Sequence, residues 1–161
     1  MAAQIGAPVA AARAHEEVFL YWASLRCGAK LPARRDLDPG ALKRHLPTLS
    51  LIDVLPAPRA FRARLAGTGL WDVYGREITG RTLPEIYAPA AADYWRAELG
   101  RVVDERRPAA GVHSLAWRGA AHLSLLWMRL PLATDGETVD MILGYDAVIG
   151  LRQVITGVKA A

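Results

Sequence analysis

Cysteine is almost absent from this sequence, since Cys27 is the only one in 161 residues. One cysteine cannot form an internal disulfide, which favours a protein of the reducing cytoplasm. Long apolar runs are also missing, because no stretch reaches the roughly 20 residues that a helix needs to cross a bilayer. The alanine-rich start has no basic residue before its apolar part, and Gly6 and Pro8 interrupt that part. We therefore expect neither export nor membrane association, and we predict a cytoplasmic protein.

Lysine is scarce as well. The chain has 20 basic residues against 16 acidic ones, a formal charge of +4, and only Lys30, Lys43 and Lys159 are lysines. Excess positive charge can attract nucleic acid, but the arginines are scattered and their densest groups are pairs such as Arg34–Arg35. This distribution is typical of a solvated surface, so we expect no nucleic-acid partner.

Motifs for nucleophilic or metal chemistry are missing too. His113 and Ser114 are consecutive, and consecutive side chains on a strand point to opposite faces. His113 and His122 fall on the two arms of a predicted hairpin, but two imidazoles without a spaced carboxylate or thiol make a poor metal site. No Gly-x-x-x-x-Gly-Lys-Ser/Thr segment is present either. The sequence therefore favours a protein that is not an enzyme and has no metal site.

Apolar spacing and turn residues predict an ordered succession of helices and strands. The order is helices, two strands, helices and three strands, and the short turn-forming links between strands favour antiparallel hairpins. An antiparallel sheet interrupted by helices is an α+β layout in which the helices can cover one face. We expect helices over 13–26, 38–47, 70–75 and 90–107, and strands over 48–55, 59–67, 109–117, 121–133 and 138–150.

These elements make one domain with additions at both ends. We expect residues 1–47 to form an N-terminal helical extension, 48–150 to form the domain, and 151–161 to form a C-terminal tail. Within the extension, Asp38 is expected to cap a short helix whose first turn contains Pro39.

The stretch FRARLAGTGLWDVYGREITGRTLPEIY, residues 61–87, joins a strand to short helices through Gly67, Thr68 and Gly69. A dinucleotide site would need Gly-x-Gly-x-x-Gly at the start of a long helix. Here Asp72 occupies the third glycine position, and its charge would repel phosphate at a helix N-terminus. We therefore interpret the glycines as a sharp corner, with Thr68 capping the next helix.

Aromatic residues are concentrated beyond this corner and in the last strands. Their usual role is core packing between helices and sheet, but they would line an apolar pocket if the helices did not collapse fully onto the sheet. Strict alternation in RAFRARLAG puts Phe61, Ala63 and Leu65 on one face, and Phe61 and Leu65 would form the floor of such a pocket. The candidate ligand-binding residues are Phe61, Leu65, Trp71, Tyr74, Tyr87, His113, Leu115 and Met128.

Four segments resemble the bacterial PAS-like family of short, largely uncharacterised proteins. They are LPARRDLDP, LPTLSLIDVL, the stretch of residues 61–87, and RLPLATDGETVDMILG, and the resemblance covers roughly 20–148. Its most specific element is LAGT followed by GREITGR. The resemblance implies a PAS-like five-stranded antiparallel sheet with short helices over one face, in a sensor or signalling module that can enclose a small ligand. It transfers no ligand or catalytic residues.

The resemblance leaves the cofactor unassigned. Light-sensing relatives that form a flavin–cysteine adduct need a cysteine on the helix that faces the flavin ring. Cys27 is the only candidate, and its place in the leading helix puts it outside the expected ligand space. An adduct photoreceptor is therefore not expected, whereas a haem held by a histidine stays open.

Three functions are consistent with these observations. The first is a non-catalytic PAS-type sensory or regulatory module of bacterial signalling, which binds a small organic ligand or a signalling partner protein and transmits through its first helix. The second is a protein–protein scaffold without a ligand, a homodimer formed through Phe19, Tyr21 and Trp22. The third is an enzyme that acts on a small apolar substrate.

Overall fold

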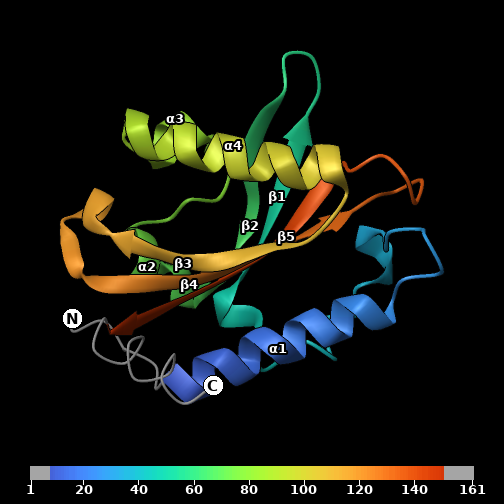
Figure 1. Ribbon diagram of the computed structural model, residues 1–161, viewed down its shortest axis with the longest axis horizontal. Coiled ribbons are helices and arrows are strands. Elements are labelled where there is room, and N and C mark those ends of the chain that lie inside the picture. Colours follow the sequence, from blue (N-terminus) through green and yellow to red (C-terminus); the bar gives the residue numbers. More distant parts are fainter. Residues whose placement is uncertain (1–7, 151–161) are drawn as a thin grey trace.

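The computed structural model describes residues 8–150, which form one sheet between helices (Figure 1). The tail expected over 151–161 lies outside these residues. The helices are α1 (Pro8–Ser24), α2 (Trp71–Tyr74), α3 (Leu83–Ile86) and α4 (Pro89–Glu105), with short 3-10 turns η1 (Arg34–Asp36), η2 (Leu46–Thr48), η3 (Thr68–Leu70) and η4 (Ala116–Arg118). The strands are β1 (Leu49–Leu55), β2 (Ala60–Ala66), β3 (Ala109–Leu115), β4 (Ala120–Leu132) and β5 (Met141–Gly150).

The sheet has five strands in the order β2-β1-β5-β4-β3, and every neighbouring pair is antiparallel. β1 and β5, which are far apart in the sequence, therefore lie side by side in the sheet. The longest ladder joins β4 to β5, from Leu123 opposite Gly150 to Leu132 opposite Met141. This architecture confirms the predicted α+β class and the five-stranded antiparallel sheet.

Helices cover both faces of the sheet. α3 and α4 lie over one face, called the inner face below, and α1 crosses the opposite, outer face (Figure 1). Two hydrogen bonds hold α1 there: Trp22 Nε1 donates to Pro131 O at 2.9 Å, and the Tyr145 hydroxyl donates to Ala11 O at 3.0 Å. The boundary placed between residues 47 and 48 stays a prediction. No helix within residues 8–150 has the length and apolar character to span a membrane.

A β-bulge in β2 corrects the expected facing of Leu65. Leu51 pairs with Leu65 and the next β1 residue, Ile52, pairs with Ala63, so Arg64 is an extra residue in β2. A bulge of this kind shifts the alternation by one residue. Leu65 therefore does not join Phe61 under the inner-face helices, and it is 53% exposed.

The segment expected as a short helix over 38–47 is a series of turns followed by η2. The Asp38 carboxylate accepts a hydrogen bond from Gly40 N at 2.8 Å, which closes a local turn rather than capping a helix. Leu42 N and Leu46 N bond to carbonyls four residues back, whereas Lys43 N and His45 N bond three residues back. A segment this short, interrupted by Gly40 and ended by Pro47, does not sustain a regular helix.

The Gly67 corner is sharp for a different reason than the one expected. Gly67 has φ −65°, which any residue can adopt. A Cβ at this position would instead overlap the backbone carbonyls of Leu46 and Pro47, so glycine is needed for close approach to η2. The expectation that Thr68 caps the next helix is wrong, because no side-chain cap is formed at the start of η3.

Candidate functional site

The centre of the inner face is an ion pair between β4 and β5. Arg129 Nη2 donates to Asp146 Oδ1 at 2.9 Å, and the two side chains are 2% and 0% exposed. Trp127 lies opposite Asp146 in the ladder and Arg129 lies opposite Gly144, so the two charges are diagonal neighbours on one face. Gly144 leaves room for the pair, because a Cβ there would contact the guanidinium and the Ser50 hydroxyl.

The guanidinium of Arg129 is held on several sides. Its Nη1 donates to Met128 O at 2.9 Å and to Tyr145 O at 3.1 Å. Its central carbon lies 4.9 Å from the ring centroid of Trp95 and 5.7 Å from that of Trp127. α4 supplies Trp95 and β4 supplies Trp127, so the cation is placed between indoles from the helical layer and the sheet. Such cation–π contacts strengthen when water is excluded.

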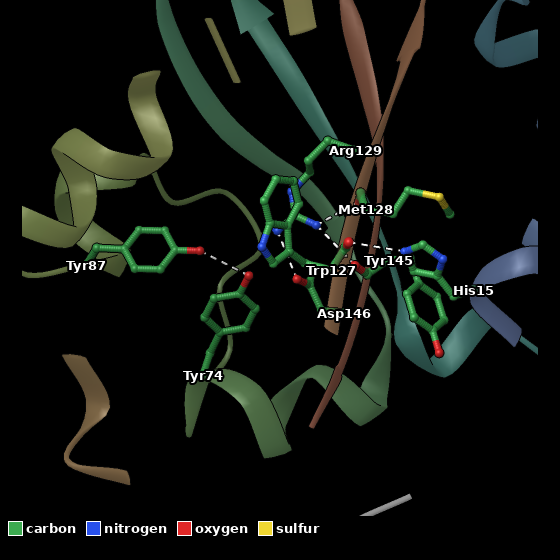
Figure 2. A network of polar contacts seen from close by, with 8 residues as sticks. All are labelled: His15, Tyr74, Tyr87, Trp127, Met128, Arg129, Tyr145 and Asp146. Carbon is green, nitrogen blue, oxygen red and sulfur yellow. Dashed lines mark hydrogen bonds and ion pairs between the residues drawn. The ribbon is translucent and has the colours of Figure 1, made fainter. Parts of the chain in front are cut away.

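Several polar atoms of this cluster have no partner within residues 8–150. An unsatisfied buried donor or acceptor costs about 1–3 kcal/mol, so such atoms are normally met by water or by a ligand. Figure 2 shows the Arg129, Trp127 and Asp146 side chains close together. The unpartnered atoms around the guanidinium are Arg129 Nε, Asp146 Oδ2, Trp95 Nε1 and Trp127 Nε1.

Two tyrosines close the site from the helical side. α2 ends at Tyr74 and Tyr87 follows α3, and the Tyr87 hydroxyl donates to the Tyr74 hydroxyl at 3.1 Å (Figure 2). Burial raises the pKa of both phenols, and the nearby Asp146 carboxylate adds to the increase. Both hydroxyls are therefore protonated at neutral pH.

The ion pair also has shifted pKa values. Burial raises the pKa of Asp146, and the adjacent Arg129 guanidinium opposes this increase. Burial lowers the pKa of Arg129, but the Asp146 carboxylate and the two tyrosines outweigh that effect and leave it above its ordinary value. Arg129 is therefore a permanent cation, and the 2.9 Å contact favours an ionised Asp146 beside it.

A small cavity lies among these side chains. Its volume is about 20 Å³, which is close to the space that one water molecule needs. Tyr74, Tyr87, Trp95, Arg129 and Ser50 contribute its polar or aromatic lining. The rest of the lining is apolar, from Ile52, Ala63, Ile78, Leu83, Ile86 and Leu99.

The residues proposed from the sequence are only partly brought together. Tyr74 and Tyr87 line the cavity, while Phe61 and Leu115 are buried in the surrounding core. His113 stacks on Tyr94, with ring centroids 4.4 Å apart, at the edge of the site. Their role in ligand binding stays a prediction.

Three of the proposed residues lie elsewhere. Leu65 faces the outer side because of the bulge, and Trp71 is exposed at the start of α2. Met128 belongs to the outer face, where it lines a depression beside His15 and Phe19 of α1. Met128 follows Trp127 in β4, and consecutive strand residues point to opposite faces.

Sequence reasoning missed the charged pair, whereas its indoles, Trp95 and Trp127, are among the aromatic residues expected in the core or around a pocket. A signal was present, since Arg129 is a lone cation in the apolar strand segment SLLWMRLPLA, and Asp146 is a lone anion in MILGYDAVIG. Opposite charges in two strands that are otherwise apolar indicate a buried pair.

Of the three α1 residues proposed for a dimer interface, one packs against the sheet of its own chain instead. Trp22 is buried and bonded to Pro131 O. The Tyr21 hydroxyl accepts a hydrogen bond from Asp38 N at 2.8 Å. Phe19 is 37% exposed, and its part in an interface stays a prediction.

No metal centre emerges from the part of the chain that the structure describes. There, no three or more histidine, cysteine, aspartate or glutamate residues gather closely enough to hold a metal ion.

Comparisons with known proteins identify the fold. Among solved structures, the PAS domain of BvgS from Bordetella pertussis is similar with a TM-score of 0.51 and 20% identity, over 70% of this chain and 88% of that one. A single-residue variant of RsLOV is similar with a TM-score of 0.50 and 17% identity, over 66% of this chain and 62% of that one. A light-oxygen-voltage domain studied with a flavin analogue is similar with a TM-score of 0.50 and 14% identity, over 75% of this chain and 90% of that one.

These structural similarities, at 14–20% identity, show the fold alone. A comparison with curated proteins finds no match. The profile of the family described as PAS domain, however, matches residues 10–146, which is most of the chain. The chain therefore belongs to the PAS domain family.

Proposed function

We propose that this PAS domain is a non-catalytic sensory module whose signal is a small, neutral, polar molecule bound beside Arg129 and Asp146. The observation that carries the proposal is the group of unpartnered buried atoms: Arg129 and Trp95 line the cavity, and Asp146 and Trp127 lie against Arg129. Arg129 Nε, Trp95 Nε1 and Trp127 Nε1 are donors, and Asp146 Oδ2 is an acceptor. A molecule with carbonyl or hydroxyl oxygens and one N–H or O–H group can pair with both the donors and the acceptor.

The charge balance favours a neutral ligand. Arg129 and Asp146 already neutralise each other at 2.9 Å, so a bound ion would add an uncompensated charge in a desolvated place. The cavity of about 20 Å³ holds about one water molecule, so a ligand of several non-hydrogen atoms enters only when the side chains around it move. Amides and small hydroxyl compounds have the required groups and need only a small movement of this kind.

The strands that hold the pair also offer a path to the outer face. On that side, the Tyr145 hydroxyl bonds to Ala11 O, and His15 Nε2 lies 3.2 Å from Trp127 O. Figure 2 displays His15 and Tyr145 on the side of the strands away from Tyr74 and Tyr87. A shift of β4 and β5 on ligand binding would therefore act on α1, which supports transmission through the first helix.

A flavin does not fit this site. One of the solved neighbours was studied with a flavin analogue, but here indoles, phenols and a guanidinium fill the inner-face space and leave about 20 Å³. Cys27, the only cysteine, is exposed and follows α1, on the other side of the sheet. Light sensing through a flavin is therefore not proposed. The protonated phenols and the closed ion pair also offer no free base or nucleophile, which supports a non-catalytic role.

The test is a titration followed by ¹H–¹⁵N spectra of the indole groups. Acetamide is the probe, because it combines a carbonyl acceptor with N–H donors, and acetate and ethylammonium are charged controls. We expect acetamide to shift the indole resonances of Trp95 and Trp127 in a saturable way, with much smaller shifts from the charged probes. Trp95→Phe and Trp127→Phe assign the two signals.

The matched control removes the polar centre without leaving a buried charge. The double variant Arg129→Met/Asp146→Leu replaces both partners by apolar side chains, which is commonly neutral or stabilising. We expect it to fold and to lose the acetamide response. An equal response in this variant, or no response in the wild type together with no small molecule in an organic extract of the purified protein, would contradict the proposal.

A homodimer through α1 is a second proposal. Leu20 and Phe19 are exposed large apolar residues of this helix, whereas Trp22 is occupied inside the domain. We expect Leu20→Glu to convert a dimer to a monomer in light scattering, while Val112→Glu on β3 leaves the mass unchanged. An unchanged mass in Leu20→Glu would refute this interface.

A further inference from the structure

A second, larger pocket lies on the outer side of the sheet. It has a volume of about 490 Å³, within the range of about 300–1,000 Å³ that small-molecule sites occupy. The segment between η1 and η2 forms one wall, and β1, β2 and β5 form the other. We call it the leucine pocket, because its lining includes Leu37, Leu42 and Leu46 from the segment and Leu51, Leu65 and Leu143 from the strands.

The apolar lining of this pocket is incompletely covered. Leu65 is 53% exposed and Leu46 is 42% exposed. The bulge at Arg64 is what turns Leu65 to this side, and bulges commonly re-aim a side chain near functional sites. Without the bulge, Leu65 would be directed to the inner face with Phe61. The local fold therefore directs an apolar side chain into an open apolar space.

The charged residues that line the pocket have one sign. They are Arg34 and Lys43, both exposed, and neither forms an ion pair within residues 8–150. The acidic neighbours are engaged locally, since Asp36 Oδ2 accepts from Ala33 N and Asp38 Oδ1 accepts from Gly40 N, each at 2.8 Å. The pocket thus combines an apolar interior with two free cations.

We propose that the leucine pocket binds the acyl chain of a single anionic amphiphile, a medium-chain fatty acid, with its carboxylate beside Arg34 and Lys43. An alkyl chain is driven into such a space by removal of apolar surface from water, and the carboxylate is attracted by the two cations. The volume suits one chain rather than a patch of bilayer. Ser50 of β1 is the one residue that lines both this pocket and the Arg129–Asp146 cavity, and all their other lining residues differ, so this site goes beyond the sensory site proposed above.

The test measures binding of decanoate, below its micelle concentration, by calorimetry with the full chain. We expect saturable binding with one site per protein. Leu65→Glu should weaken it at least about tenfold, because the new carboxylate repels the ligand and breaks the apolar lining. The double variant Arg34→Ala/Lys43→Ala should weaken it about threefold to tenfold and remove most of its salt dependence. Val112→Glu, an exposed apolar residue on β3, is the matched control and should bind like the wild type.

Two further measurements test the charge of the head group and whether the ligand is a free fatty acid or a membrane lipid. Decyltrimethylammonium has the same chain with a cationic head, and it should bind at least about tenfold more weakly than decanoate. Anionic phospholipid vesicles should compete poorly with decanoate. Circular dichroism confirms that each variant is folded, since all the changed side chains are exposed.

Three results would overturn the proposal. The first is equal decanoate affinity in the wild type and Leu65→Glu. The second is equal affinity for the anionic and cationic amphiphiles. The third is binding to vesicles without any binding of free decanoate, which would instead assign this surface to a membrane.

Discussion

The inner and outer faces of the sheet carry pockets of opposite character. On the inner face, an ion pair, indoles and phenols surround about 20 Å³. On the outer face, leucines surround about 490 Å³ and the charges stand at the surface. The difference follows from coverage: α3 and α4 pack over the inner face, whereas turns and η2 cover that part of the outer face. Irregular chain fills space less completely than a helix that is packed along its length.

β1 shows how one strand serves both sides. Ile52 lines the inner cavity, Leu49 and Leu51 line the leucine pocket, and Ser50 borders both. Alternation along the strand therefore assigns each side chain to a face. The bulge in β2 is the point where this rule is broken, and it transfers Leu65 from one face to the other.

The largest expected effect comes from breaking the inner-face ion pair. Asp146→Ala leaves the Arg129 charge buried without a partner, so we expect the free energy of unfolding to fall by about 3–5 kcal/mol. The double variant Arg129→Met/Asp146→Leu should be as stable as the wild type. Urea denaturation measures both. If the two variants lost equal stability, the charge would not be the cause.

Two apolar truncations in β2 compare the faces directly. Phe61→Ala should cost about 3–5 kcal/mol, because it leaves a cavity in the packed inner side. Leu65→Ala should cost less than about 1 kcal/mol, since half of that side chain is already in water. Thermal and urea unfolding of both variants test the bulge. Similar losses would mean that the clean alternation expected from the sequence is right after all.

Glycine substitutions probe the close approaches on each side. Gly67→Ala should cost about 2–3 kcal/mol, because its Cβ would overlap the backbone at Leu46 and Pro47. Gly144→Ala should cost about 1–2 kcal/mol, since the neighbouring Arg129 and Ser50 are side chains that can move.

Gly100→Ala in α4 is the matched control for these two variants. Its Cβ would meet nothing nearer than Arg59 Nη1 at 3.9 Å, so we expect stabilisation of up to about 1 kcal/mol from helix propensity. Stabilisation by Gly67→Ala would contradict the close approach to η2.

The smallest effect concerns pH at the edge of the inner site. Burial lowers the pKa of His113, so the unfolded chain binds this proton more readily than the folded one. The stability that His113 contributes is therefore present above its unfolded pKa of about 6.5 and is lost as the pH falls below it. Between about pH 7.5 and 5.5, the free energy of unfolding of the wild type should therefore fall by more than that of His113→Phe. An equal loss of stability in the two proteins would mean that the His113 ring is fully hydrated in the folded state.

The strands could be predicted because their signals are local. Alternating residues in 59–67 and the apolar runs in 121–133 and 138–150 predicted β2, β4 and β5 within a few residues. The link between the strands expected over 109–117 and 121–133 contains Gly119, which has the positive φ of 77° that favours glycine. Such features depend on neighbours along the chain and need no knowledge of the fold.

The candidate site was predicted only in part, because it depends on distant contacts. Tyr74 and Tyr87 were proposed from their aromatic character, but Leu65, Trp71 and Met128 were placed on the wrong side or in the wrong environment. Arg129 and Asp146 were overlooked: their isolation in apolar strands indicated burial, but only the β4–β5 register shows that they meet.

The sequence by itself determined the class of this fold and the order of its elements, because turn residues and the period of apolar side chains act over a few residues. Only the tertiary structure decided which charges are buried together, where the strand alternation is interrupted, and how much space each face keeps. Those properties arise from pairing between strands and from packing of helices that are far apart along the chain. The two pockets on which the two ligand-binding proposals depend belong to this second group.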